Sequence, residues 1–260
     1  MNYIDIPIFY INLKKDNQRN KSFINAANKY NLNINRVEAI NGYDFKDKLN
    51  IIKVNGKNYK FKIKCKKYPL PSQLGCCLSH LKAIIHIKDL GLESAIIMED
   101  DIDFSLFKKW TPIVNFKNIL KCAPKDWELI KLHSSNRINQ NYIYDKFLKE
   151  SKLYLDLDPY NLKNWSTMCY IINKNYINSF FEKYYIDDCF IFDINFFVAD
   201  IVMYFKKNLY NFTIPLFKSK NFNTNIFFKI SHNQKNPYDE RSNVIIDNFW
   251  ENLKIEDKII

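Results

Sequence analysis

The stretch AIIMEDD at residues 95–101 decides the fold prediction, because a short apolar strand runs directly into three consecutive acids. In open α/β sheets, ligands bind in the crevice outside the carboxyl ends of the strands. Adjacent carboxylates repel one another unless a cation is present, and hard oxygen ligands prefer Mg²⁺ or Mn²⁺. A metal held there would bridge the carboxylates to a diphosphate. The alternative interpretation is an acidic turn on the surface.

The segments around this stretch alternate between strand and helix patterns. Strands are predicted at 4–13, 36–40, 127–132 and 165–173, where apolar residues form short runs. Helices are predicted at 73–90, at 175–185, at 195–207 and within 14–30, where apolar residues recur every three or four positions. This alternation is typical of an α/β sheet.

A β-hairpin is predicted at residues 51–66, where an alternating run follows Asn55-Gly56. Asn-Gly is the preferred sequence of a two-residue type I′ turn. The lysines of the second strand would share one face. They are interpreted either as the solvated side chains of an edge strand or as a basic flap near an anionic substrate.

The composition of the 260-residue chain predicts one globular domain spanning 1–260, because 47% of it is hydrophobic and 26% is charged. The net charge of +11 could indicate a nucleic-acid partner. Only four arginines offer the planar fork that reads phosphate or guanine. We therefore expect no specific nucleic acid, and instead a general attraction to anionic ligands such as sugar nucleotides, with peripheral contact to an anionic membrane as a further option.

The start of the chain and its cysteines predict a cytoplasmic protein, bacterial or in the cytosol of a virus-infected host cell. Residues 1–12 carry Asp5 and Pro7 and lack a basic start and a cleavage site, so no signal peptide or transmembrane segment is expected. The six cysteines have no CxxC or paired zinc spacing, which indicates free thiols in a reducing compartment.

Asp200 interrupts an apolar stretch of the helix predicted at 195–207. Such surroundings either raise the pKa of a carboxyl group or require a hydrogen-bonding partner. Asp200 is interpreted either as a structural carboxylate or as a functional one.

Seven motifs resemble, in the same order, those of glycosyltransferase family 25, whose members include bacterial lipooligosaccharide galactosyltransferases and collagen hydroxylysine galactosyltransferases. GCCLSH at 75–80 is the most specific match. The others are FYINLK at 9–14 with Arg19 behind it, AING at 39–42, AIIMEDD at 95–101, WELIKL at 127–132, TMCYII at 167–172 and ADIVM at 199–203. With residues 242–244, which fall where members often have an SD[IV] motif, the resemblance spans about residues 8–245.

The resemblance implies a GT-A-like, Rossmann-like fold, in which a mixed sheet flanked by helices binds a nucleotide sugar. It implies a UDP-sugar donor, Mn²⁺ or Mg²⁺, and inversion at the anomeric carbon. It implies that Glu99 and Asp101 hold the metal, with Asp101 expected to bind it directly, and that Asp100 and Glu99 contact the donor. Asn12 and Arg19 would lie near the nucleotide or its phosphates. Ser79 and His80 would line or brace the donor pocket. Asp200 is the expected catalytic base, with a second metal-ligand role as the rival interpretation.

Two positions depart from the family pattern. Asn243 stands where members often have Asp, and Cys169 stands where they have Gly. His232 is a further candidate metal ligand near the end of the domain.

The expected function is transfer of a hexose, galactose first and glucose second, from a UDP-sugar to a hydroxyl of a glycan or of a hydroxylysine-containing protein. The alternatives are a non-catalytic scaffold that binds nucleotide sugar or glycan, and a metal-dependent phosphoesterase. A scaffold would tolerate the loss of Asp200 or Asp101, whereas a phosphoesterase would not require a sugar nucleotide. The oligomeric state is left open.

Overall fold

The computed structural model describes residues 4–44, 50–158, 166–220 and 237–253. The strands are β1 Ile8–Asn12, β2 Ile34–Glu38, β3 Ile51–Val54, β4 Lys57–Lys64, β5 Ser94–Glu99, β6 Ile102–Asp103, β7 Leu129–Lys131, β8 Tyr154–Asp156, β9 Cys169–Asn173, β10 Tyr185–Ile186, β11 Cys189–Asp193, β12 Leu209–Phe212 and β13 Lys218–Ser219. The α-helices are α1 Asn17–Asn28, α2 Pro71–Asp89, α3 Phe107–Trp110, α4 Phe116–Lys121, α5 Arg137–Glu150, α6 Lys174–Tyr184, α7 Ala199–Val202 and α8 Pro237–Asn252. In this part of the chain, no helix combines the length and the apolar character needed to cross a membrane.

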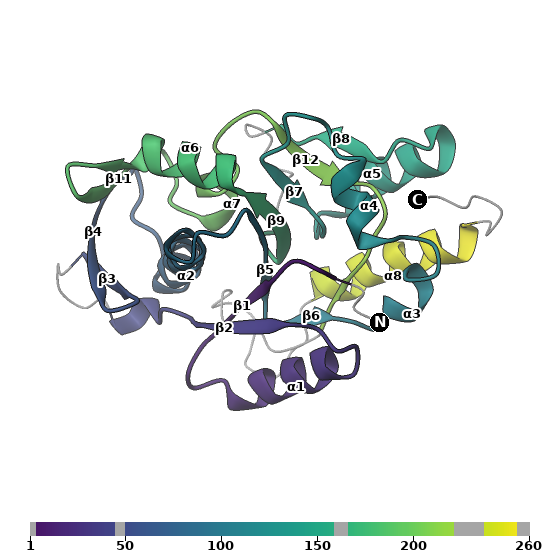
Figure 1. The fold of residues 1–260 in the computed structure, drawn as a ribbon, viewed down its shortest axis with the longest axis horizontal. Helices are drawn as coiled ribbons and strands as arrows, with labels where there is room; N and C mark the ends of the chain where they lie inside the picture. The colour runs from purple at the N-terminus through teal and green to yellow at the C-terminus, as the bar shows by residue number, and fades with distance from the viewer. Residues whose placement is uncertain (1–3, 45–49, 159–165, 221–236, 254–260) are drawn as a thin grey trace.

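A seven-stranded mixed sheet forms the centre of the molecule, in the order β2-β1-β5-β9-β7-β12-β8 (Figure 1). β1 pairs parallel with β2 and β5, whereas β9 runs antiparallel between β5 and β7. The carboxyl ends of β1, β5 and β7 therefore lie at one edge of the sheet, and β9 begins at that same edge. A mixed sheet flanked by helices is the predicted fold class, and this edge is where a ligand crevice is expected.

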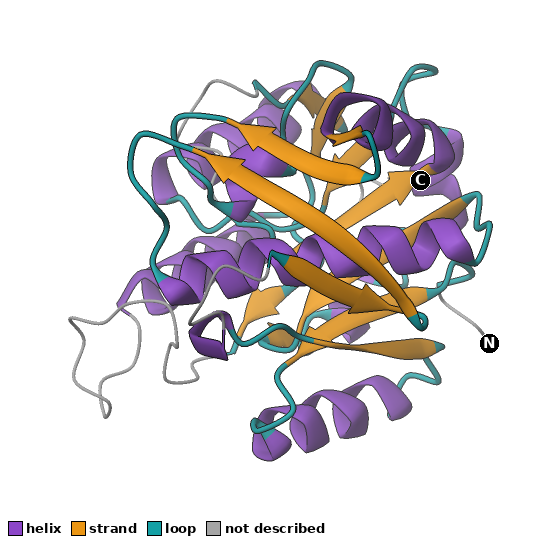
Figure 2. Cartoon of the chain, turned by 90° about the vertical axis from the view of Figure 1, so that its left-hand side faces the viewer, coloured by secondary structure: helices purple, strands orange, loops and turns teal. Residues whose placement is uncertain are grey.

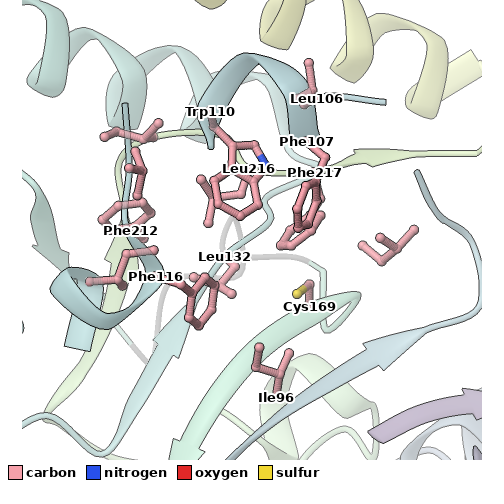
Figure 3. Packing of buried hydrophobic residues seen from close by; sticks show 14 of the residues in the cluster. Ile96, Leu106, Phe107, Trp110, Phe116, Leu132, Cys169, Phe212, Leu216 and Phe217 are labelled. Carbon is pink, nitrogen blue, oxygen red and sulfur yellow. The ribbon is translucent and has the colours of Figure 1, made fainter. Parts of the chain in front are cut away.

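Two hydrophobic cores cover the two faces of this sheet. One core contains residues of α2 and α6, and the other contains residues of α1, α3, α4, α5 and α8. Figure 1 shows α2 and α6 on the left of the sheet and α3, α4 and α8 on the right. On the second side, Trp110 packs against Phe107 and Phe217 at ring-centroid distances of 4.5 and 6.4 Å (Figure 3). Large aromatic side chains thus supply much of the apolar area that this side buries.

A smaller four-stranded sheet, in the order β10-β11-β4-β3, packs on the α2 side and lies toward the viewer in Figure 2. The predicted hairpin is confirmed, because Asn55 and Gly56 both have positive φ angles of 49° and 82°, as a type I′ turn requires. The edge-strand interpretation of β4 is wrong, since β11 pairs with it along its other side. The pairing comes from residues more than a hundred positions away, which no local pattern reveals. The lysines of β4 are exposed, and a basic flap stays a prediction.

The helix predicted at 195–207 is also wrong in its extent. Only α7, at Ala199–Val202, is helical there. Val198 has extended backbone angles, and Phe196 forms a parallel bridge with Lys67. Tertiary pairing therefore overrides the apolar pattern, and Asp200 lies in the first turn of a very short helix. Trp165, where a strand was predicted to begin, lies outside the described residues.

Two motif glycines explain why the AING and GCCLSH motifs occur together. A Cβ atom on Gly75 would lie 2.6 Å from the carbonyl oxygen of Ile40 and 2.7 Å from the amide nitrogen of Gly42. A Cβ atom on Gly42 would lie still closer to the carbonyl oxygen of Pro71. The first turns of α2 therefore contact the loop after β2 backbone to backbone, which only glycine allows at both positions.

Gly75→Ala is expected to lower the free energy of unfolding by about 1–3 kcal/mol, because the new methyl group must push backbone against backbone. Urea denaturation of the variant measures this loss. Lys88→Ala, at the exposed end of the same helix, is the control and should change stability little. Equal stability of the two variants would contradict the close contact.

Candidate active site

The acidic motif ends β5, and its three carboxylates lie in different surroundings. Asp100 is buried, whereas the side chains of Glu99 and Asp101 keep 21% and 23% of their exposure. The middle acid therefore faces the protein, and the two outer acids remain accessible to a ligand.

Asp100 is held by residues from the first strand and the first helix. The Asn12 amide donates to Asp100 Oδ2 at 2.5 Å, and Arg36 donates to Asn12 Oδ1 at 2.7 Å. The Arg19 guanidinium forms ion pairs with Asp100 and, at 3.2 Å, with Asp101. Burial lowers the pKa of Arg19, but attraction to Asp101 and Asp100 outweighs burial, so the pKa is raised and the charge is retained. Asn12 thus orients an acid from inside the protein, while Arg19 bridges the buried acid and an accessible one.

Glu99 is positioned from α2 and from the segment before β9. His80 Nε2 lies 3.3 Å from Glu99 Oε1, and the Thr167 hydroxyl donates to the same oxygen at 3.1 Å. The other ring nitrogen of His80 lies 2.8 Å from the Tyr170 hydroxyl. Burial raises the pKa of Glu99, but the hydrogen bonds from His80 and Thr167 outweigh burial and lower the pKa. Glu99 is therefore held as a carboxylate.

Ser79 does not face the acids. Its hydroxyl donates to the carbonyl oxygen of Gly75 at 2.6 Å and accepts from the amide of Ile40 at 2.8 Å. The side chain is buried. Of the two roles predicted for Ser79, these contacts support bracing of the helix, and a direct contact with the donor stays a prediction.

A buried lysine lies near Asp200. Lys131 ends β7, opposite Tyr170 of β9, and its side chain is 1% exposed. Its Nζ lies 5.2 Å from the centroid of the Tyr204 ring. Burial lowers the pKa of Lys131 to about 7, although the negative charge of Asp200 opposes this shift. The structure therefore places near Asp200 a lysine that gains or loses its proton close to neutral pH.

Ser166 connects Asp200 to the motif, and its backbone is strained at a φ of 103°. The Ser166 amide donates to Asp200 Oδ1 at 2.7 Å, and the Tyr204 hydroxyl donates to the Ser166 carbonyl at 2.6 Å. The next residue, Thr167, is the one that binds Glu99. Burial raises the pKa of Asp200, while the charge of Lys131 and the Ser166 hydrogen bond act in the opposite direction. Asp200 is therefore a stronger base than an exposed aspartate.

His133 follows β7 and is buried, with Nδ1 2.9 Å from the Ser166 hydroxyl. Its Nε2 has no hydrogen-bond partner among the described residues. The His133 residue lines a cavity of about 10 Å³, which admits roughly one water molecule. Burial is the main cause that lowers the pKa of His133 to about 3, and the positive charge of Lys131 lowers it further. The negative charge of Glu99 raises this pKa by a smaller amount. The imidazole is therefore neutral at physiological pH.

Acidification is expected to destabilise the protein through His133. Because the folded pKa is about 3 and the unfolded value is near 6.5, the unfolded state alone binds the proton between these values, so stability falls as the pH drops below 6.5. At pH 5 the loss from this residue is about 2 kcal/mol. In His133→Asn, the difference in free energy of unfolding between pH 7.5 and pH 5 should shrink by that amount. An unchanged pH dependence would contradict the neutral, buried imidazole.

Asn243, which stands where the family often has Asp, forms a two-way bond inside the protein. Its amide donates to the Ser219 carbonyl at 2.8 Å, and its oxygen accepts from the Ser219 amide at 3.2 Å. Ser219 belongs to β13, which pairs with β6, and the Lys220 amide donates to the Asp101 carbonyl at 2.6 Å. The side-chain amide of Asn243 therefore ties α8 to the backbone that supports the acidic motif.

Asn243→Asp is expected to cost about 1–3 kcal/mol of unfolding free energy, because a carboxylate cannot donate and would face the Ser219 carbonyl oxygen. Thermal or chemical denaturation measures this loss. Asn248→Asp, at an exposed position of the same helix, provides the matched control. If both variants are equally stable, the two-way bond does not hold α8 in place.

The structure thus brings Asn12, Arg19, His80, Glu99, Asp100 and Asp101 together at one edge of the sheet, with Asp200 close enough for Glu99 and His80 to influence its pKa. Sequence reasoning missed Lys131, Ser166 and Tyr204. The signal for Lys131 was available, because it is a lysine inside an otherwise apolar strand. His232, the late candidate ligand, lies outside the described residues.

The model of glycosyltransferase family 25, described as an LPS biosynthesis protein family, matches residues 5–197. Human procollagen galactosyltransferase 2 is 29% identical over 129 residues, which are 47% of this chain and 20% of that protein. The chain therefore aligns with about a fifth of the length of this relative.

Proposed function

Because the chain belongs to glycosyltransferase family 25, we propose that it is an inverting, metal-dependent glycosyltransferase. The proposed reaction moves a hexose, galactose first and glucose second, from a UDP-sugar to a hydroxyl of a glycan or of a hydroxylysine-containing protein. The galactose preference draws on the human relative, whose name describes a procollagen galactosyltransferase. The observation that carries the proposal is the cluster of acids at the carboxyl end of β5, held in place by Asn12 at the end of β1 and by Thr167 just before β9.

The acidic cluster fits a hard divalent cation. Among the described residues, its three carboxylates lie near two cations, the Arg19 guanidinium and the Lys220 ammonium, so the acids still outnumber the positive charges. Glu99 and Asp101 are partly exposed and offer the oxygen donors that Mn²⁺ and Mg²⁺ prefer. We assign the metal to these two residues and give Asp100 the role of fixing Arg19. When bound, the metal would stabilise the negative charge of the departing diphosphate.

Arg19 is proposed to share the work of charge stabilisation. Its guanidinium is held by two carboxylates and retains 17% side-chain exposure at the mouth of the cluster. A guanidinium fits phosphate oxygens with two parallel hydrogen bonds. The exposed part of the guanidinium would contact the donor diphosphate. Asn12 would keep Asp100 in position through its hydrogen bond, and Arg36 would in turn hold Asn12.

Asp200 is proposed as the base that takes the proton from the acceptor hydroxyl. A base acts best when its pKa is raised toward the working pH, and burial shifts Asp200 in that direction. Ser166 fixes one carboxylate oxygen through its amide, which orients the other. Lys131 then limits how far the pKa rises, so that the carboxylate stays ionised before the reaction.

Calorimetry with a panel of UDP-, GDP- and CMP-sugars, each with and without Mn²⁺, tests the donor assignment. The proposal predicts that a UDP-hexose binds with the metal and binds much more weakly without it. Binding that persists in Asp101→Asn and Asp200→Asn without any turnover would instead favour a scaffold. Phosphodiester hydrolysis without any sugar-nucleotide binding would favour a phosphoesterase.

A further inference from the structure

Cys76 lies beside the acidic motif, and the proposed mechanism gives its thiol no role. The Cys76 thiol, an imidazole nitrogen of His80 and a carboxylate oxygen of Glu99 all lie within 4.8 Å of one another. Cys76 and His80 are four residues apart on α2, so they share one face of the helix. The cysteines have no paired zinc spacing in the sequence, and this mixed cluster arises only when β5 packs beside α2.

The separation of two of the ligand atoms matches tetrahedral coordination. Bonds of about 2.0–2.1 Å from zinc to nitrogen and oxygen, meeting at a tetrahedral angle, place those two atoms about 3.3–3.4 Å apart. His80 Nε2 and Glu99 Oε1 are 3.3 Å apart. These two ligands are therefore already at the separation that a bound ion would impose, and the Cys76 thiol, within 4.8 Å of both, is the third ligand.

The surroundings of the cluster are those of a supported metal site. The Tyr170 hydroxyl lies 2.8 Å from the second ring nitrogen of His80, and the Thr167 hydroxyl binds Glu99. Partners of this kind orient ligating imidazoles and carboxylates. His80 is buried, whereas Cys76 and Glu99 are partly exposed, so an ion would reach the cluster from the solvent side.

We propose that Cys76, His80 and Glu99 form a binding site for a thiophilic divalent cation of the Zn²⁺ type. Thiolate and imidazole ligands select zinc over Mg²⁺ and Mn²⁺, which prefer oxygen. Binding would release the thiol proton of Cys76 to solvent, because the thiolate is the ligand. His80 would bind through a deprotonated Nε2, so its ring proton would move to Nδ1, which faces the Tyr170 hydroxyl. Since the site shares Glu99 with the hard-metal cluster, zinc would compete with Mn²⁺ for that carboxylate and inhibit transfer. This inhibition rests on the proposed function, whereas binding does not.

Titration of the intact chain with Co²⁺, a spectroscopic substitute for Zn²⁺, tests binding directly. The site predicts a thiolate-to-cobalt charge-transfer band in the near ultraviolet, which Zn²⁺ displaces and which Cys76→Ser and Cys76→Ala both remove. Cys77→Ala is the matched control, because Cys77 is fully buried in the core and outside the cluster. Calorimetry should show zinc affinity reduced by about tenfold or more in Cys76→Ser. Absence of the band in the wild type, or its survival in folded Cys76 variants, would overturn the proposal.

The second arm measures inhibition of sugar transfer by zinc at a fixed Mn²⁺ concentration. The half-inhibitory zinc concentration should rise by about tenfold in Cys76→Ser and stay unchanged in Cys77→Ala. A cobalt band without any transferase activity would separate failure of the proposed function from failure of the zinc site. Equal zinc sensitivity of wild type and Cys76→Ser would overturn the inhibitory role.

Discussion

Asp101→Asn is expected to lower the kcat/KM for sugar transfer by about a thousandfold, the scale at which a lost charge-stabilising group affects an enzyme. Asp101 is the partly exposed acid that pairs with Arg19 and faces the proposed metal position. An asparagine keeps an oxygen that can accept from Arg19, so the fold should survive while the negative charge disappears. The variant should also need a higher Mn²⁺ concentration for half-maximal rate.

Asp103→Asn is the matched control for this variant. Asp103 lies two residues further along and accepts a hydrogen bond from the Ser105 amide at 2.8 Å, which an asparagine oxygen can also accept. Its activity and its Mn²⁺ requirement should match those of the wild type. Full activity of Asp101→Asn at an unchanged Mn²⁺ requirement would show that Asp101 does not bind the metal.

Asp200→Asn is expected to lower kcat by about 10²–10⁴-fold, the contribution that general base catalysis makes. An asparagine oxygen can still accept from the Ser166 amide, so the strained corner at Ser166 should remain in place. The KM for the donor should change much less than kcat, because Asp200 is proposed to act on the acceptor hydroxyl. Steady-state kinetics with varied donor, together with the circular dichroism spectrum, measures both effects.

The rival role for Asp200, as a second metal ligand, predicts a different pattern. In that case Asp200→Asn would raise the Mn²⁺ concentration needed for half-maximal rate, and saturating metal would restore part of the activity. Asp193→Asn, at the exposed end of β11, controls for the loss of a carboxylate elsewhere. Wild-type kcat in Asp200→Asn would exclude both roles and favour a structural carboxylate.

The main features of the fold could be predicted because the decisive signals are local. The apolar run before the three acids identifies β5 and its carboxyl end, and Asn55-Gly56 identifies the hairpin turn. The same reasoning predicted too long a helix at 195–207. The segment is apolar, but Phe196 forms a β-bridge with Lys67, so only Ala199–Val202 is helical. The reasoning also failed for β4, because β11 reaches that strand from a distant part of the chain.

The candidate site could be predicted only in part, for a related reason. Sequence motifs identify residues that belong to the site, but they do not tell which acid faces inward, and only the contacts of Asn12 show that Asp100 does. Lys131 and Tyr170 meet because β7 and β9 are adjacent and antiparallel, an arrangement that depends on the whole sheet. The Cys76 cluster likewise requires α2 and β5 to pack together.

Release of the nucleoside diphosphate or monophosphate from sugar nucleotides is the most direct test of the proposed function. The purified chain would be incubated with UDP-, GDP- and CMP-sugars, with and without Mn²⁺, in the presence of hydroxylysine peptides or bacterial glycan acceptors. We expect UDP release from a UDP-hexose, galactose first, that requires the metal and is lost in Asp101→Asn. Release that is equally fast without metal, or no release from any sugar nucleotide under any metal condition, would contradict a metal-dependent glycosyltransferase.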